Sequence, residues 1–331
     1  MQLRPLGRSG LRVTPMGLGL AALGRPGYIN LSHAEDLDHT YDVEKMEAHT
    51  HEVLNAAWDA GIRYFDAARS YGRAEQFLGS WLRKRKILPG AVTVGSKWGY
   101  TYTADWQVEA DVHEVKEHSI DVLNRQWGET QENLGHQLDL YQIHSATFSS
   151  GVLENNTVLN ALAQLKENGT AIGLTLSGAN QPAVLARALE IETNGVLLFD
   201  TVQATWNLLE PSTGPQLAEA HAAGLGVIVK ETLANGRLTP KNDHPRFADE
   251  YTLLTQQAER LNTTVDALAL AAVLAQPWAG VILSGAATVE HLQSNVKALD
   301  VAWDEEAAET LARLAEPPEM YWEKRSNLDW N

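Results

Sequence analysis

Eight short apolar or β-branched segments recur along the 331-residue chain, and segments with helical periodicity separate them. Strict alternation of this kind favours a parallel sheet, because each parallel strand needs a long crossover before the next one. Eight is also the number of parallel strands that closes a barrel. The predicted strands are Met16–Leu20, Arg63–Phe65, Val92–Ser96, Leu138–Ile143, Ala171–Leu176, Leu197–Gln203, Gly226–Val229 and Gly280–Leu283.

The segments between these strands show the spacing of apolar residues that predicts amphipathic helices. A β-hairpin is expected ahead of the first strand, turning at Gly7–Gly10. We therefore expect an α/β fold, a (β/α)8 TIM barrel that forms a single domain over residues 1–331, because no linker divides the chain. The predicted helices are His49–Ala60, Ala74–Arg85, Val112–Leu134, Thr157–Asn168, Pro182–Thr193, Gly214–Ala223, Val265–Gln276, Val289–Leu299 and Asp304–Ala315.

The same alternation also fits an open, doubly wound sheet. The segment GLGLAA at Gly17–Ala22 resembles a dinucleotide-binding G-x-G-x-x-A turn. However, LGRPG follows where a helix would have to begin, and no acidic residue stands at the spacing expected for a ribose contact. The barrel is therefore the preferred prediction.

Two long polar loops follow predicted strands, Arg25–Lys45 after the first and Glu231–Phe247 after the seventh. In a barrel both loops would overhang the carboxyl ends of the strands, where barrel sites are built. We expect them to form a lid or a pocket wall, the alternative being surface excursions without a role.

Composition narrows the classes of function. The formal net charge of −16 argues against a nucleic acid partner, and the absence of cysteine fits a reducing cytoplasm. No segment is apolar enough to cross a membrane, so a cytoplasmic protein is expected. No H-x-H or H-E-x-x-H motif is present, and we predict no metal site.

Four polar residues lie at or just beyond the ends of predicted strands: Asp66, Tyr71, Lys97 and His144. Each alone has a structural explanation, such as a salt bridge or a buried histidine. Together at the strand ends of a barrel they predict a proton-donating site. A free tyrosine has a pKa of ~10, and a neighbouring ammonium would favour its phenolate. We expect Tyr71 to act as general acid and base, with His144 donating a hydrogen bond to a carbonyl oxygen.

The segments YFDAARSYG, VGSKWG and LDLYQIH resemble the three catalytic segments of the aldo-keto reductase superfamily. The resemblance extends over nearly the whole chain and carries the catalytic tetrad onto Asp66, Tyr71, Lys97 and His144. It implies an enzyme that interconverts an aldehyde or ketone, a sugar among the candidates, with the alcohol. It also implies NAD(P)(H) as the cofactor.

The resemblance further implies that the cofactor lies across the loops after the later strands. Backbone donors in such loops and a helix N-terminus suit a diphosphate. The candidate cofactor-binding residues are Thr175, Ser177, Gln203, Trp206, Lys230, Thr232, Leu233, Asn235, Arg237, Ser284, Gly285, Thr288 and Asn295.

The chain departs from the family pattern at three places. Lys230 stands where many relatives have an aromatic residue against the nicotinamide, so stacking would need its stem or Trp206. Gly285 and His291 replace cations that often reach the 2′-phosphate, which leaves NAD and NADP both open. The serine–asparagine pair of the family pattern after the fifth strand is altered here to Thr175-Leu176-Ser177.

Aromatic residues after Lys97 predict a substrate pocket that includes Trp98 and Tyr100. The aromatic C-terminal tail could cover the site, pack on the barrel wall or join two subunits. We expect a monomer or small homo-oligomer that acts on a small molecule. Two other functions are left open: a cofactor-binding regulatory barrel resembling potassium-channel β subunits, and a barrel hydrolase or isomerase.

Overall fold

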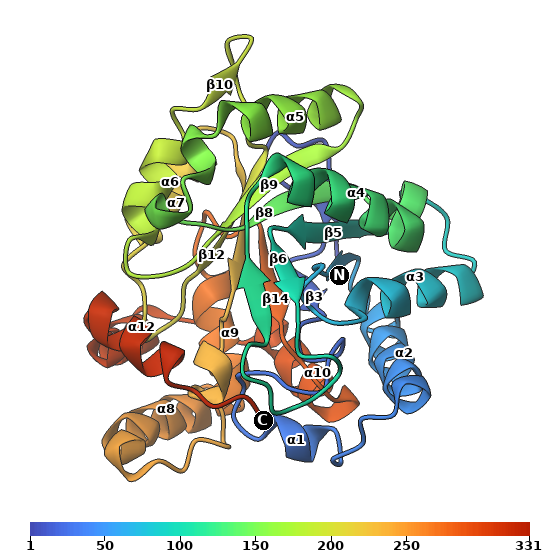
Figure 1. The fold of residues 1–331 in the computed structure, drawn as a ribbon. Helices are drawn as coiled ribbons and strands as arrows, with labels where there is room; N and C mark the ends of the chain where they lie inside the picture. Colours follow the sequence, from blue (N-terminus) through green and yellow to red (C-terminus); the bar gives the residue numbers. More distant parts are fainter.

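A computed structural model describes residues 1–331, and its eight parallel strands close into a barrel (Figure 1). The strands follow one another around the barrel in chain order, and the last pairs with the first. The predicted TIM barrel is therefore confirmed. Its strands are β3 (Met16–Gly19), β4 (Tyr64–Asp66), β5 (Thr93–Trp98), β8 (Leu140–Ala146), β9 (Ala171–Leu176), β12 (Thr201–Thr205), β13 (Gly226–Lys230) and β14 (Val281–Ser284).

Helices surround the barrel and cover the outer faces of the strands (Figure 1). The barrel strands are almost entirely buried, because side chains fill the interior on one face and helices cover the other. The helices are α1 (His33–Asp36), α2 (Val43–Asp59), α3 (Ala74–Lys84), α4 (Ile120–Leu134), α5 (Asn156–Glu167), α6 (Gln181–Ala188), α7 (Gly214–Ala222), α8 (Ala248–Arg260), α9 (Val265–Leu274), α10 (Val289–Val296), α11 (Glu305–Leu311) and α12 (Pro318–Ser326).

The predicted N-terminal hairpin is present and closes the floor of the barrel. Its strands β1 (Arg4–Pro5) and β2 (Arg12–Val13) pair antiparallel. Leu6, at the start of the turn, is completely buried in an apolar cluster formed with residues of the barrel strands. Gly226 makes this approach possible, since a Cβ there would lie 2.5 Å from Leu6 Cγ.

One predicted helix begins later than expected. The segment before α4 forms an antiparallel hairpin, β6 (Tyr100–Tyr102) with β7 (Glu114–Lys116), instead of extending the helix back to Val112. Ser119 sets the true start of α4, because its side chain accepts a hydrogen bond from the Val122 backbone N–H.

The sixth predicted strand was placed too early in the chain. A small hairpin, β10 (Glu192–Thr193) with β11 (Val196–Leu197), precedes the barrel strand β12 and projects from the molecule (Figure 1). Asn194 and Gly195 form its turn with positive φ angles, which the apolar run alone did not indicate. Helices α8 and α12 were not predicted, because both lie in segments interpreted as connecting or terminal.

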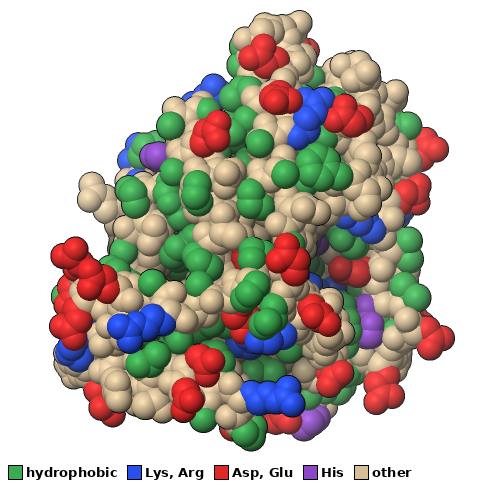
Figure 2. Space-filling model, turned by 90° about the vertical axis from the view of Figure 1, so that its left-hand side faces the viewer, with side chains coloured by type: hydrophobic (Ala, Val, Ile, Leu, Met, Phe, Trp, Pro, Cys, Tyr) green, Lys and Arg blue, Asp and Glu red, His purple; other side chains and the backbone are tan.

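Acidic, basic and hydrophobic side chains are interspersed over the face drawn in Figure 2, so no one kind of side chain covers it. None of the helices combines the length and the apolar character that crossing a bilayer requires.

Both long loops lie over the carboxyl ends of the barrel strands and line one cavity there. Residues 25–36 come from the first loop and residues 231–241 from the second. The Nζ of Lys241 pairs with the carboxylate of Asp36, which joins the two loops. The expected role as pocket walls thus agrees with their position.

We predict that Leu6→Ala lowers the free energy of unfolding by about 2–5 kcal/mol, because it leaves a cavity beneath the barrel. Chemical denaturation followed by tryptophan fluorescence measures this change. Leu3→Ala is the matched control, since Leu3 is exposed beside the same hairpin, and it should cost about 0.5 kcal/mol or less. Equal losses in both variants would show that the hairpin does not close the floor.

Candidate active site

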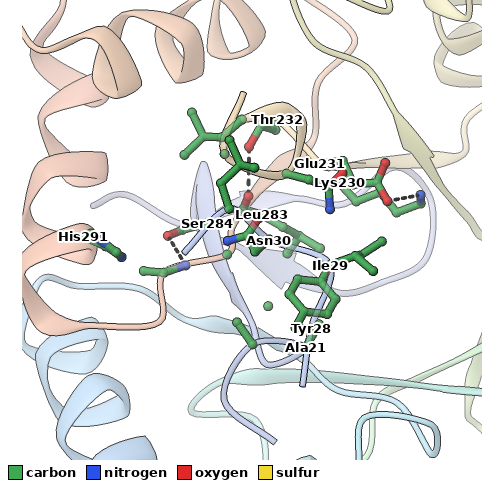
Figure 3. Close-up of a pocket in the computed structure, with 18 of the residues that line it drawn as sticks. Ala21, Tyr28, Ile29, Asn30, Lys230, Glu231, Thr232, Leu283, Ser284 and His291 are labelled. Atoms are coloured by element: carbon green, nitrogen blue, oxygen red, sulfur yellow. Dashed lines mark hydrogen bonds and ion pairs between the residues drawn. The ribbon is translucent and has the colours of Figure 1, made fainter. Parts of the chain in front are cut away.

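A cavity of about 640 Å³ opens at the carboxyl ends of the barrel strands (Figure 3). Figure 3 shows His291 and Ser284 on one side of it and Tyr28, Lys230 and Glu231 on the other. We call the second side the tyrosine end, with its lining residues Tyr28, Tyr71, Tyr100 and His144. We call the first side the α10 end, with its lining residues Asp36, Lys241, Asp266, Glu290 and His291.

A buried ion pair lies beneath the tyrosine end. Lys97 projects from β5 and Asp66 from the end of β4, and their side chains are 1% and 2% exposed. Lys97 Nζ donates hydrogen bonds to Asp66 Oδ2 and to the Ala67 carbonyl, the latter at 2.9 Å. Burial lowers the pKa of Lys97 and the charge of Asp66 opposes this shift.

The second oxygen of Asp66 is also fully engaged. Oδ1 accepts hydrogen bonds from Tyr64 Oη at 3.0 Å, Gln142 Nε2 at 3.3 Å and Gln203 Nε2 at 3.2 Å. Buried charges are stable only where such bonds replace water. Gln203, which the resemblance assigns to a cofactor carboxamide, uses its amide nitrogen here on the carboxylate and still lines the cavity.

Tyr71 lies at the cavity wall in the loop after β4. Lys97 Nζ stands 4.7 Å from the centre of its ring, so the two side chains that the sequence singled out do meet. Gly24 allows the loop to pack closely, since a Cβ there would lie 2.2 Å from the Tyr71 carbonyl oxygen.

The expected acidification of Tyr71 is not what this site produces. Burial, and after it the charge of Asp66, raises the pKa of Tyr71, and Arg25 only partly opposes them. Lys97 Nζ is directed to Asp66 and Ala67 and lies beneath the face of the ring, rather than donating to the phenol oxygen. The Tyr71 phenol therefore keeps its proton near neutral pH.

His144 extends from β8 between two tyrosines. Its ring packs edge-on against Tyr71 and Tyr100, with centroid distances of 5.5 and 4.9 Å. Nδ1 lies 3.4 Å from Ser70 Oγ, and Nε2 has no partner within the protein. Burial, followed by the charges of Lys97 and other cations, lowers the pKa of His144 well below its usual range, so the ring is neutral.

A second layer of charge roofs the tyrosine end. Arg25 is buried, pairs with Glu114 at 3.0 Å and donates to the Ser70 carbonyl at 3.0 Å. Its guanidinium lies 5.3 Å from the Tyr71 ring centre and 4.7 Å from that of Trp330. The C-terminal tail therefore covers the site, which was one of the three roles considered for it.

Lys230, at the end of β13, belongs to a buried charge network. Its Nζ donates to Thr205 Oγ1 at 2.8 Å and lies 3.5 Å from Glu231, which also pairs with Arg325 at 2.6 Å. Burial lowers the pKa of Lys230 to about 8. Burial alone would raise the pKa of Glu231, but the charges of Arg325 and Lys230 hold it at about 2.

Most of the candidate cofactor-binding residues line this cavity. The loop that carries them is held in an unusual conformation, with positive φ at Glu231, Ala234 and Asn235. Asn235 Oδ1 is buried without a partner, and a Cβ at Gly285 would meet nothing within 4 Å. The Asn235 oxygen can accept a hydrogen bond from a ligand, and the space beside Gly285 leaves room for one. Both features fit a polar ligand such as a dinucleotide. The lining candidates are Ser177, Gln203, Lys230, Thr232, Leu233, Asn235, Ser284, Gly285 and Asn295.

Five candidates lie outside the cavity wall. Trp98 is buried and packs edge-on against His118, while Trp206 packs against Trp278, so neither ring reaches the cavity. Thr175 is buried beside Ser145, and Arg237 pairs with Glu316 at 2.5 Å. Thr288 caps α10 by accepting a hydrogen bond from a backbone N–H.

The roof residues escaped the sequence-based search. Arg25 and Glu114 are 89 positions apart, and the Glu231–Arg325 pair spans 94 positions. The loops that carry Arg25 and Glu231 were recognised as overhanging the site. Glu114 fell in a predicted helix and Arg325 in the C-terminal tail, and no local pattern pairs these side chains. In the whole structure, no group of three or more His, Asp or Glu side chains is arranged to hold a metal ion.

The chain is similar to known proteins over most of its length. The model of the Aldo/keto reductase family matches residues 15–316. Pyridoxal 4-dehydrogenase of Microbacterium luteolum is 28% identical, with 88% of this chain and 91% of the relative covered. Norsolorinic acid reductase of Aspergillus flavus is 23% identical, with 90% and 76% covered.

Among solved structures, the holo form of aldo-keto reductase AKR11C1 from Bacillus halodurans superposes with a TM-score of 0.72. It is 20% identical and the match covers 96% of this chain and 97% of that one, which supports the shared fold. Since the family model spans most of the chain and the related proteins are oxidoreductases, the chain belongs to the aldo/keto reductase family.

Proposed function

We propose that the protein is an NAD(P)(H)-dependent oxidoreductase that interconverts an aldehyde or ketone with its alcohol. The observation that carries this proposal is the position of Tyr71 and His144 at one end of the cavity, above the buried Asp66–Lys97 pair. The membership in the aldo/keto reductase family, whose members generally use NAD(P)H, supports it.

Tyr71 acts as the general acid. Reduction of a carbonyl leaves charge on its oxygen, which a proton donor must neutralise as the C–H bond forms. The phenol is protonated at neutral pH, because the ordinary tyrosine pKa of ~10 is already well above 7 and burial raises the pKa of Tyr71 further. In the oxidation direction the phenolate takes the proton of the alcohol. The Lys97 ammonium, held by Asp66 beneath the ring, stabilises that phenolate.

His144 positions the carbonyl oxygen. Its ring is neutral, and Ser70 Oγ lies within reach of Nδ1. With Ser70 donating to Nδ1, Nε2 carries the proton and donates a hydrogen bond into the cavity. A donor fixed in this way stabilises the oxygen as its charge grows, without reorienting.

The coenzyme supplies or accepts the hydride when it is bound. Ser284, Gly285 and Asn295 would hold it at the α10 end, together with Thr232 and Asn235 along the middle of the cavity. The predicted contacts from Thr175, Trp206, Arg237 and Thr288 are indirect in this proposal, because those side chains support the lining residues from behind.

The walls of the tyrosine end favour a ring-bearing, polar substrate. Tyr28, Tyr100 and Trp330 offer flat apolar faces. Arg25 and Lys230 stand beside them and can donate hydrogen bonds to substituents, and their acidic partners Glu114 and Glu231 can accept hydrogen bonds. Pyridoxal, named in one relative, and cyclic sugars both have this combination of a ring and polar groups.

We predict that Tyr71→Phe lowers kcat for carbonyl reduction by about 10²–10⁴-fold, because the phenyl ring keeps the shape of the site but has no proton to donate. Coenzyme affinity, measured by quenching of tryptophan fluorescence, should stay within about twofold. Steady-state assays with a panel of aromatic aldehydes and sugars measure the rate.

Tyr251→Phe serves as control, since Tyr251 lies on α8 away from the cavity, and it should keep full activity. Full activity in Tyr71→Phe would remove the acid role of Tyr71. If the wild-type protein binds coenzyme but reduces no carbonyl compound, the cofactor-binding regulatory barrel becomes the better explanation.

The pH profile of kcat should differ between the two directions. The protonated phenol is lost only as pH rises through its folded-state pKa, which burial raises above the ordinary ~10. Reduction at saturating substrate should therefore stay level between about pH 6 and pH 9, whereas oxidation, which needs the phenolate, should rise with pH. A fall in the reduction rate with a midpoint below about pH 8 would contradict this assignment.

A further inference from the structure

The α10 end of the cavity is dominated by carboxylates. Asp36 reaches it from α1, Asp266 from the first turn of α9 and Glu290 from the first turn of α10. All three line this end of the cavity together with His291 and Lys241. Three carboxylates thus face one ammonium and one imidazole.

Lys241 is the ammonium at this end, and Asp36 already holds it. The Asp36 side chain is 8% exposed and pairs through Oδ1 with Lys241 Nζ, with His291 Nε2 3.7 Å away. His291 supplies little positive charge, because burial lowers its pKa and the attraction of Asp36 only partly restores it. The two arginines that line the cavity, Arg25 and Arg325, both belong to the tyrosine end.

Asp266 faces this end with a polar neighbour rather than a cation. With its amide oriented to satisfy its surroundings, Asn295 donates to Asp266 Oδ2 at 3.3 Å and accepts from Ser284 Oγ at 2.8 Å. The neutral side chains of Asn295 and Ser284 and the carboxylate of Asp266 therefore lie together where α10, β14 and α9 meet.

A dinucleotide whose reactive ring lies at the tyrosine end extends its adenosine half toward the α10 end, because Figure 3 shows His291 and Ser284 on the side of the cavity opposite Tyr28 and Lys230. NAD and NADP differ only in this adenosine half, where NAD has a ribose hydroxyl and NADP has a phosphate. A ribose hydroxyl donates well to a carboxylate, whereas a carboxylate repels a phosphate, which arginine or free lysine would bind.

We propose that the site selects NAD(H) over NADP(H), and that Asp36 is the specificity-determining residue because it occupies Lys241 and presents a carboxylate to the ribose. This inference rests on the proposed coenzyme-dependent function. It concerns binding, so it is tested by coenzyme affinity and needs no substrate.

Isothermal titration with NADH and with NADPH tests the proposal on the wild-type protein and on Asp36→Ala. The wild type should bind NADH at least ~10-fold more tightly than NADPH. Asp36→Ala removes the carboxylate and releases Lys241, so its NADPH affinity should rise ~10-fold or more relative to NADH. Asp36→Asn, which keeps the size of the side chain, provides the same comparison if the alanine variant folds poorly.

Two further variants separate the mechanism from a general effect of charge. Glu35→Ala removes a neighbouring carboxylate of α1 that does not line the cavity, and it should leave both affinities unchanged. Adding Lys241→Ala to Asp36→Ala should abolish most of the gained NADPH affinity.

Tighter binding of NADPH than of NADH by the wild type would overturn the proposal, as would an unchanged NADH-to-NADPH ratio in Asp36→Ala. Either result leaves the coenzyme-dependent function standing. Failure of the wild type to bind either coenzyme would instead overturn the proposed function, and this inference with it.

Discussion

The buried pair of Lys97 and Asp66 is the interaction on which the site depends. Removing two charges from water costs several kcal/mol per ion, and their attraction offsets this only where every remaining donor and acceptor is satisfied. The barrel supplies additional hydrogen bonds to the pair through the Ala67 carbonyl and the side chains of Tyr64, Gln142 and Gln203. Strands β4, β5, β8 and β12 therefore converge on one carboxylate.

This pair fixes a positive charge beneath the ring of Tyr71 without acidifying the phenol in the site as described. Because the ammonium is neutralised by Asp66 and the ring is buried, the phenol remains protonated. The same burial keeps His144 neutral. Both groups can then act as hydrogen-bond or proton donors at neutral pH. In the proposed reaction the buried charge matters most when a phenolate forms.

The two long loops connect this chemistry to coenzyme and substrate selection. They follow β3 and β13, so they rise from the same edge of the barrel as the tetrad. The first loop contributes Arg25 and Tyr28 to the tyrosine end and Asp36 to the α10 end. A single loop thus reaches both the substrate side and the proposed ribose side of the cavity.

The sequence predicted best those features that depend on a local pattern, namely the buried strands and the polar residues at their ends. The alternation of apolar segments predicted the closed barrel, and the residues ending its strands led to Asp66, Lys97 and His144. The β6–β7 hairpin was missed because its second strand, Glu114–Lys116, lies in the segment that was interpreted as the start of the helix ending at Leu134. Trp98 and Trp206 do not line the cavity, because Trp98 packs against His118 and Trp206 packs against Trp278. Sequence position near a strand end does not reveal where a ring points.

The contacts that could not be predicted are long-range pairs of charged side chains, such as Asp36 with Lys241, which are 205 positions apart. The central claim, however, is local: a buried phenol that keeps its proton above a neutralised ammonium. NMR titration of protein labelled at tyrosine Cζ, with Tyr71 assigned by its absence in Tyr71→Phe, measures it directly. The Tyr71 signal should keep its protonated chemical shift up to about pH 10. Ionisation of Tyr71 with a midpoint below about pH 8 would contradict the account.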